Sequence, residues 1–254
     1  MLTLSIEEKQ FISRLEDSLE RVEERYQEEV TDFLEPRLQL VADEFLRSKK
    51  FTRYLFCGGY EEAERKRLVL YPEYTEGDCE LAGIHLYRFR GRLDFVSVTH
   101  RDFLGALMSL GLRREKFGDL LVRESGCDLF LEEEIASYIL QSELRVKRVP
   151  LELTEVPLDQ FEPPEQKTKE LNLMVSSMRL DTLVANSLGL SRAKGMELIQ
   201  SGRVKVNHSE IKANDYICRE GDLISCRGKG RLRVGAISGE TRKGKLRVCI
   251  IKYI

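Results

Sequence analysis

The chain has 254 residues, 42% of them hydrophobic, and its formal net charge is −2 at pH 7. This length allows two or three domains with buried cores. Because no stretch approaches 18 apolar residues and no basic start leads into an apolar run, the sequence argues against a membrane-spanning or secreted protein and predicts a cytoplasmic one.

The small net charge is the sum of an acidic region and a basic region. Residues 176–254 carry 16 Lys and Arg against 7 Asp and Glu, a net of +9, whereas residues 1–175 carry a net of −11. A basic module therefore follows an acidic body, and a basic region of this kind favours nucleic acid as its partner.

The cysteines and histidines give little material for a metal or redox site. The six cysteines form no C-x-x-C pair and are scattered over every expected domain, which predicts thiols in a reducing cytosol. They are Cys57, Cys79, Cys127, Cys218, Cys226 and Cys249. The three histidines stand at no metal-ligand spacing, so we expect no metal site. We also expect no cofactor and no small-molecule substrate.

Residues 1–75 are predicted to form a helical or α+β region. Apolar residues recur at helical spacing in the first 26 residues and again after Pro36, which suits the first turn of a second helix. Strands are expected at Tyr54–Phe56 and Leu68–Tyr71. The stripe of the first helix is Phe11, Leu15, Leu19, Val22 and Tyr26.

Between those strands, a short helix is predicted over Glu61–Arg67. Its acidic residues come first and its basic residues last, the order that a helix dipole favours. A solvated helix is the simpler interpretation, and a second RNA contact through Arg65, Lys66 and Arg67 is the alternative.

Residues 76–154 show the pattern of a small α+β domain. Strands are predicted at Ile84–Phe89, at Leu93–Val98 and, last, near Val146–Leu153. From Leu93 onward the order is strand, helix, strand, strand, helix, strand, the ferredoxin-like arrangement that RNA-recognition motifs share. The aromatic pattern that those motifs use to stack bases is missing from the Cys127–Leu131 strand, so base stacking on this sheet is not predicted.

Two catalytic motifs occur in this region in incomplete form. The tetrapeptide GRLD ending at Asp94 matches the surroundings of the catalytic Asp in some pseudouridine synthases, but the residues that follow and the domain order differ. The HRD run at 100–102 is similar to a kinase catalytic loop, yet Leu107 stands where that loop has Asn. No catalytic site is therefore expected, and Asp94 stays a less favoured alternative.

Residues 155–174 hold three prolines and many charges without periodicity, which predicts an extended linker. The basic module, residues 175–254, then opens with two predicted helices. The apolar face of the first is Leu180, Leu183, Val184 and Leu188. The second is capped by Ser191, ends near Gly202 and has a buried side of Ala193, Met196 and Ile199.

Short strands complete the module, with a turn after the first of them at Asn207–Ser209. The predicted strands are Val204–Val206, Leu223–Cys226, Arg233–Ile237 and Lys245–Lys252.

Basic side chains gather at the start of the second helix, where Arg192 and Lys194 lie in the first turn. The helix dipole disfavours cations there by roughly 0.3–1 kcal/mol each, but backbone N–H groups at the same end attract anions, so the pattern predicts a phosphate site. Arg203, Lys205, Arg227 and Lys229 continue the basic character through the strands that follow.

Several spaced positions of the module follow a known pattern. Residues 179–181 (RLD), 191–193 (SRA), the run 199–207 and the Gly-Asp pair at 221–222 resemble the S4-type RNA-binding domain. The resemblance implies RNA contacts from the second helix and the loop after it. With the basic residues of the strands, the predicted RNA-binding residues are Arg179, Ser191, Arg192, Lys194, Arg203, Lys205, Asn207, Arg227 and Lys229. One departure is His208, which stands where many members have Gly.

Further stretches extend the resemblance over nearly the whole chain: GGYEEAER at 58–65, YPEY at 71–74, THRDFLGAL at 99–107 and FGD at 117–119. In this order they resemble the YlmH-type S4-domain proteins. The resemblance implies RNA binding without catalysis, on the large ribosomal subunit and tRNA, during quality control of stalled nascent chains. Bacterial members often lie in cell-division loci, and relatives occur in cyanobacteria and plastids.

The fold expected is α+β, with a helical or α+β N-terminal region, a ferredoxin-like middle domain and an S4-type domain with a β-hairpin tail. The leading hypothesis is a monomeric, non-enzymatic protein that binds rRNA or tRNA on the large ribosomal subunit. Because phosphate contacts position without specifying, weak sequence preference and steep salt dependence are expected. A cell-division adaptor acting through the acidic N-terminal helices and an RNA-modifying enzyme using Asp94 are the alternatives.

Overall fold

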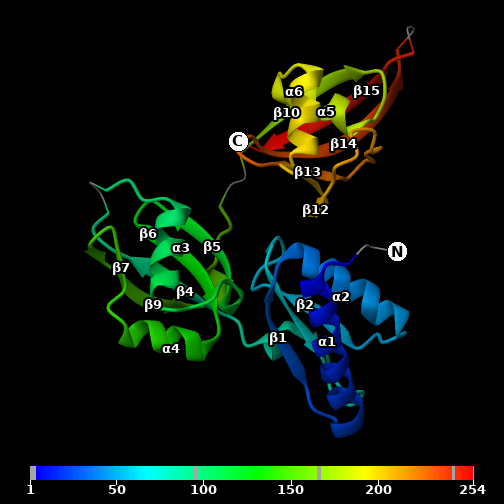
Figure 1. Ribbon diagram of the computed structural model, residues 1–254. Coiled ribbons are helices and arrows are strands. Elements are labelled where there is room, and N and C mark those ends of the chain that lie inside the picture. Colours follow the sequence, from blue (N-terminus) through cyan, green and yellow to red (C-terminus); the bar gives the residue numbers. More distant parts are fainter. Residues whose placement is uncertain (1–3, 94–95, 165–166, 242–243, 254) are drawn as a thin grey trace. The chain divides into compact units, whose positions relative to one another are not determined.

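The computed structural model describes residues 4–93, 96–164, 167–241 and 244–253 (Figure 1). The chain divides into two compact units, Met1–Pro163 and Pro164–Ile254. The first unit combines the N-terminal region with the middle domain, and the second is the basic module.

In the N-terminal region, two helices pack on a three-stranded antiparallel sheet. Pro36 starts the second helix at a position where its missing N–H is not needed, as predicted. The helical stripe is confirmed from Phe11 to Val22, but Tyr26 ends the first helix with a φ of 55° and is 60% exposed. The elements are α1 (Ile6–Arg25), α2 (Pro36–Ser48) and, in sheet order, β1 (Glu29–Leu34), β3 (Lys66–Leu70) and β2 (Tyr54–Cys57).

The helix predicted over Glu61–Arg67 is wrong, because residues 61–65 form a turn and β3 begins at Lys66. The carboxylate of Asp119 accepts hydrogen bonds from the backbone N–H groups of Glu64 (2.7 Å) and Arg65 (3.0 Å). A carboxylate 54 residues away along the chain thus holds the turn. Local sequence carries no sign of that contact.

The middle domain has the ferredoxin-like topology. Its antiparallel sheet has the order β5-β6-β4-β9, and α3 and α4 pack on one face of it. The elements are β4 (His85–Arg90), α3 (His100–Ser109), β5 (Phe117–Arg123), β6 (Gly126–Leu131), α4 (Glu133–Gln141) and β9 (Glu152–Val156), with the hairpin β7 (Arg145–Val146) and β8 (Val149–Pro150) and the 3-10 turns η1 (Cys79–Ala82), η2 (Arg114–Lys116) and η3 (Leu158–Gln160).

Two strand predictions in this domain are corrected. The described residues of Leu93–Val98 form no strand, and residues 94 and 95 lie outside the described part of the chain. The strand predicted at Ile84–Phe89 takes the first place instead, since β4 pairs with both β6 and β9. The strand predicted near Val146–Leu153 is broken into β7, β8 and the start of β9, because residues 147 and 148 turn the chain through positive φ.

The two sheets of the first unit share one apolar core. Phe33 and Val69 of the N-terminal sheet pack with Leu86 and Phe130 of the middle sheet. The ring of Phe161, beyond η3, lies 5.1 Å from that of Phe130. RNA-recognition motifs leave this face of the sheet open for bases, whereas here other parts of the unit cover the Leu86 and Phe130 positions.

The expectation of six thiols is wrong for two cysteines. Cys57 at the end of β2 and Cys79 in η1 form a disulfide across 22 residues, a pairing that spacing could not indicate because the fold brings the two elements together. Cys127, Cys218 and Cys226 are free and buried. Burial raises the pKa of the Cys218 thiol to about 12 and that of Cys226 to about 11, which keeps both unreactive at neutral pH.

The second unit is a six-stranded antiparallel sheet with α5 and α6 on one face (Figure 1). The sheet order is β10-β15-β14-β13-β11-β12. Alternate strand residues such as Val204, Ile224 and Val234 form the core with Leu183 and Ile199 of the helices. The elements are β10 (Thr168–Val175), α5 (Leu180–Leu188), α6 (Arg192–Gln200), β11 (Val204–Val206), β12 (Ser209–Glu210), β13 (Leu223–Cys226), β14 (Gly230–Glu240) and β15 (Leu246–Tyr253).

The linker predicted over residues 155–174 is shorter in the structure. β9 ends at Val156, and β10, which begins at Thr168, pairs with β15 along all of its eight residues. Leu171 and Leu173 pack against the core of the module, while Glu170, Asn172 and Met174, which alternate with them, are exposed. Because apolar Met174 lies on the exposed side, the apolar and polar residues do not alternate cleanly along this strand.

Candidate nucleic-acid interface

The helix α6 begins with an N-cap and two cations. The Oγ of Ser191 accepts a hydrogen bond from the backbone N–H of Lys194 (3.3 Å), which confirms the predicted cap. Arg192 and Lys194 are exposed, and the first turn contains no acidic residue. An anion at this end would meet free backbone donors and two cations together.

Arg179 and Arg192 converge on the carboxylate of Asp181, whose side chain is 0% exposed. Arg179 Nη2 lies 3.0 Å and Arg192 Nη2 3.1 Å from Oδ2 of Asp181. Burial alone raises the pKa of this carboxyl, but hydrogen bonds from Arg179, Arg192 and Thr182 outweigh the burial and hold the pKa below its ordinary value. A fixed negative charge therefore orients two of the predicted site residues.

Asp181 engages only part of the Arg192 guanidinium. Its contacts come from Nε and Nη2, and a guanidinium has five N–H donors. The Arg192 side chain is 64% exposed, against 34% for Arg179. Arg192 is thus anchored on one edge and available to a phosphate on the other.

Close packing of α5 and α6 brings the two arginines together. Gly195 of α6 is buried, and a Cβ built there would lie 3.2 Å from the carbonyl oxygen of Asp181 and 3.3 Å from the Cβ of Ala185. The prediction that Ala193 lies on the buried side is wrong, because Ala193 is exposed and Gly195 takes that place. The absence of a side chain at Gly195 lets the helices approach.

The remaining predicted cations divide between two places. Arg203 and Arg227 are neighbours, since the N–H of Arg227 donates to the carbonyl oxygen of Arg203 (2.8 Å), and Lys229 follows in the same turn. Lys205 is also exposed, but it stands between two buried valines of β11 and so lies on the sheet face opposite the helices. The structure therefore does not bring Lys205 together with Arg192 and Lys194.

The side chain of Asn207 is used within the fold. Its Nδ2 donates to Oδ1 of Asp222 (2.7 Å), and its Oδ1 accepts from the N–H of Leu223 (2.9 Å). Asn207 and His208 have φ values of 46° and 64°, as a two-residue hairpin turn requires. His208 therefore adopts the conformation for which glycine is usual, and an RNA contact from Asn207 stays a prediction.

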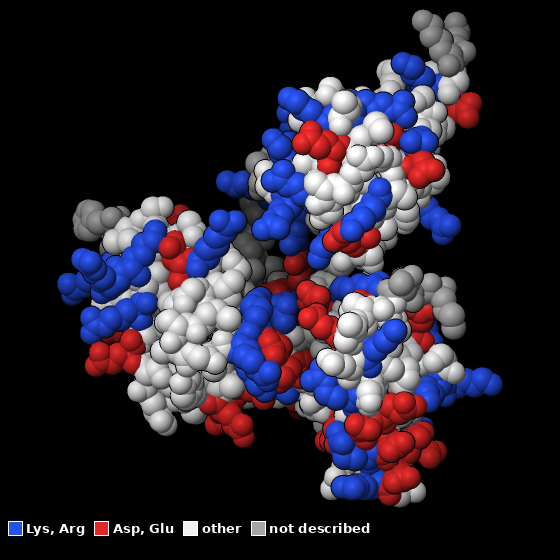
Figure 2. All heavy atoms as spheres, viewed as in Figure 1, with Lys and Arg blue, Asp and Glu red and all other residues white. Residues whose placement is uncertain are grey.

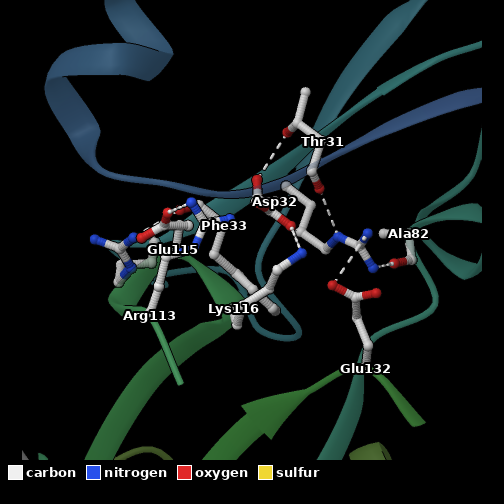
Figure 3. A network of polar contacts seen from close by, with 10 residues as sticks. Thr31, Asp32, Phe33, Ala82, Arg113, Glu115, Lys116 and Glu132 are labelled. Carbon is white, nitrogen blue, oxygen red and sulfur yellow. Dashed lines mark hydrogen bonds and ion pairs between the residues drawn. The ribbon is translucent and has the colours of Figure 1, made fainter. Parts of the chain in front are cut away.

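The basic residues at the start of β3 and directly before it also make contacts inside the first unit. Arg67 is 8% exposed and donates to the carbonyl oxygens of Thr31 (2.8 Å) and Ala82 (2.6 Å). It also forms an ion pair with Glu132 (3.4 Å). Figure 3 shows Thr31, Ala82 and Glu132 coming together from different parts of the unit. Arg65 donates to the carbonyl oxygen of Phe33 (2.6 Å), and Lys66 to that of residue 61. Their predicted RNA contact gains no support from this arrangement.

Basic side chains prevail on the visible surface of the second unit (Figure 2). On this face, Lys and Arg outnumber Asp and Glu.

Within the described residues, no group of three or more His, Cys, Asp or Glu side chains could hold a metal ion. No helix in the described ranges is long and apolar enough to cross a membrane.

Three family models match the chain in succession. They are described as the N-terminal region of YlmH (residues 7–75), a putative RNA-binding domain in YlmH (residues 80–160) and the S4 domain (residues 178–224).

Two curated proteins and one solved structure are also similar to this chain. The chain is 36% identical over 245 residues to the ribosome-associated protein quality control protein P2 of Bacillus subtilis, covering 95% of this chain and 94% of that protein. A shorter match, 42% over 52 residues, is to an uncharacterized RNA pseudouridine synthase of Aquifex aeolicus and covers 20% of this chain and 22% of that protein. Among solved structures, the cell division protein ylmH from Streptococcus pneumoniae has a similar fold, with a TM-score of 0.54 and 24% identity over 63% of this chain and 97% of that chain.

Proposed function

The chain belongs to the YlmH family of S4-domain proteins, and on that premise we propose that it is a non-enzymatic RNA-binding protein that binds rRNA or tRNA on the large ribosomal subunit. A cytoplasmic location and a monomeric state are parts of the same proposal. The relative in Bacillus subtilis is named as a ribosome-associated quality control protein, which supports a ribosomal partner for this chain.

The observation that carries the proposal is the start of α6. Ser191 fixes the helix end, Asp181 fixes the inner edge of Arg192, and the outer edge of Arg192 lies beside Lys194 in a turn without acidic residues. Such a site recognises a phosphate by charge and by backbone donors, and it reads no base. We therefore expect affinity for structured RNA with weak sequence preference.

The absence of catalysis belongs to the proposal as well. Asp94, the residue that an RNA-modifying enzyme would use, lies outside the described residues, and the short match to a pseudouridine synthase covers a fifth of the chain. Incubating total RNA with the protein and with Asp94→Asn tests this point. Uridine isomerisation by the wild type that Asp94→Asn abolishes would replace the proposal with an enzymatic one.

RNA titration at several salt concentrations tests the α6 end directly. For Arg192→Ala/Lys194→Ala, we expect a shallower dependence of log affinity on log salt, by about 0.7–0.9 for each phosphate that is no longer neutralised, and weaker binding at every concentration. Because Asp181 keeps its hydrogen bonds from Arg179 and Thr182 when Arg192 is removed, the variant should keep its fold.

The matched control is Lys9→Ala/Lys50→Ala, which removes the same charge from exposed positions of the N-terminal region. The control should bind as the wild type does. Equal losses of affinity in both variants would mean that net charge alone governs binding, and the α6 end would then have no special role.

A further inference from the structure

We propose that the middle domain carries a second phosphate-binding surface for RNA, built around the tip of the β7–β8 hairpin and separate from the α6 end. We call it the hairpin surface. It consists of six exposed cations: Arg90, Arg92, Arg101, Arg145, Lys147 and Arg148.

Close packing and hydrogen bonds bring the three segments of this surface together. Gly91 packs against β8, where an added Cβ would lie 3.0 Å from the carbonyl oxygen of Pro150. Lys147 Nζ donates to the carbonyl oxygen of Ser97 (2.6 Å) and lies 3.2 Å from Oδ2 of Asp102, in the first turn of α3. The segment after β4, the hairpin and the start of α3 therefore meet, and Figure 2 shows Lys and Arg gathered on the part of the domain that carries β7.

The cations of the hairpin surface are only partly neutralised. Asp102 pairs with Lys147 and also caps α3 through Thr99, and Glu143 pairs with Arg145 (3.1 Å). Among the residues that the structure describes, Arg92, Arg101 and Arg148 have no ion pair, so the surface keeps a positive excess. This positive excess is exceptional, because residues 1–175 as a whole have a net charge of −11. A positive surface of this kind is complementary to a polyanion.

The backbone at the hairpin tip is unusual for these residue types. Lys147 and Arg148 have φ values of 47° and 73°, in a two-residue turn for which Asn-Gly is the favoured sequence. Two long cations are thus held side by side in a conformation that non-glycine residues rarely adopt. Outliers of this kind cluster at functional sites.

In the described part of the chain, the middle sheet has no open face for RNA, which favours a binding surface elsewhere on the domain. Phe130 and Leu86 lie in a core with the N-terminal sheet, and Arg88 and Arg123 both bind Asp128, whose side chain is 0% exposed. The face that RNA-recognition motifs use is therefore occupied within the unit. The family model that matches residues 80–160 is described as a putative RNA-binding domain, and the hairpin surface gives that domain an exposed place for RNA.

The test uses a substitution that removes charge while suiting the turn. In the full chain, Lys147→Asn/Arg148→Gly loses two cations and gains residues that tolerate positive φ. We expect unchanged urea unfolding, RNA affinity at least about fivefold lower at 0.1 M salt, and a salt slope shallower by about 0.7–0.9 for each phosphate that the variant no longer neutralises. Lys9→Asn/Lys50→Gly is the matched control, because it removes the same charge and Lys50 also has a positive φ of 58°.

Each outcome decides the proposal. Wild-type affinity and slope in the hairpin variant would overturn it, and so would an equal loss of affinity in the control. Should removal of the Lys147–Asp102 ion pair destabilise the hairpin variant, Arg92→Gln/Arg101→Gln gives the same decision without touching that pair. Arg192→Ala/Lys194→Ala is measured in parallel to separate the two surfaces. If only this variant loses binding, RNA binds through the α6 end and the hairpin surface is overturned. If only the hairpin variant loses binding, RNA binds through the hairpin surface and not through the α6 end.

Discussion

At the scale of single residues, the buried carboxylate of Asp181 organises the candidate interface. It holds Arg179 and Arg192 at hydrogen-bond distance. Because the carboxylate is buried, these two cations compensate the cost of removing its charge from water. The free edge of Arg192 is thereby placed at the start of α6 before any RNA arrives. Such preorganisation reduces the side-chain entropy that binding would otherwise cost.

Replacement of Asp181 by Asn tests this role. Because the charged hydrogen bonds are removed and both arginines are partly exposed, we expect a free energy of unfolding lower by about 1–2 kcal/mol at pH 7, measured by urea titration. The folded-state pKa lies below the ordinary value of 3.8, so the carboxylate stabilises the fold above that pH and the gain is lost as pH falls through the folded-state value.

The stability difference between wild type and Asp181→Asn should accordingly close below pH 3.8. Asp215→Asn, at an exposed position of the same unit, is the control and should have little effect. A difference that stays constant down to pH 2 would mean that the carboxylate charge is not the cause.

Sequence can predict those site residues whose role is local. Ser191, Arg192 and Lys194 follow from cap and helix-end chemistry over four residues. The anchoring role of Asp181 cannot be predicted in this way, although Asp181 belongs to the RLD motif, because its second partner comes from the next helix. The same holds for Asn207, whose amide binds Asp222, 15 residues further along the chain.

At the scale of elements, strong periodicity or a cap suffices to predict α1, α2, α5 and α6. The failures have one main cause, which is a partner distant in sequence. Hydrogen bonds to Asp119 hold the backbone at Glu64 and Arg65 in a turn, where a helix was predicted. Pairing with β6 and β9 makes β4 the first strand of the ferredoxin-like sheet, the place predicted for Leu93–Val98. The sequence gives no sign of β1, because this strand lies at a sheet edge and buries only its last two residues.

The disulfide between β2 and η1 gives a prediction at this scale. Closing a loop across 22 residues should stabilise the first unit by about 3 kcal/mol through the unfolded chain. We therefore expect reductant to lower the urea midpoint of the wild type, and Cys79→Ser to have that lower midpoint with or without reductant. Cys249→Ser, which removes a free thiol, should respond to reductant as the wild type does. A wild-type midpoint that reductant leaves unchanged would contradict this role.

At the scale of the whole molecule, charge is segregated along the chain. Residues 176–254 have a net charge of +9, and residues 1–175 have a net charge of −11. RNA is therefore attracted to the second unit and repelled by most of the first, apart from the local excess at the hairpin surface.

The central claim is that the chain binds the large ribosomal subunit through the start of α6. Sedimentation of the tagged protein in cell lysate through a density gradient tests it most directly, with Arg192→Ala/Lys194→Ala beside the wild type. We expect the wild type to travel with the large subunit and the variant to stay at the top of the gradient. A wild type that stays at the top even at low salt, or a variant that still travels with the subunit, would contradict the claim.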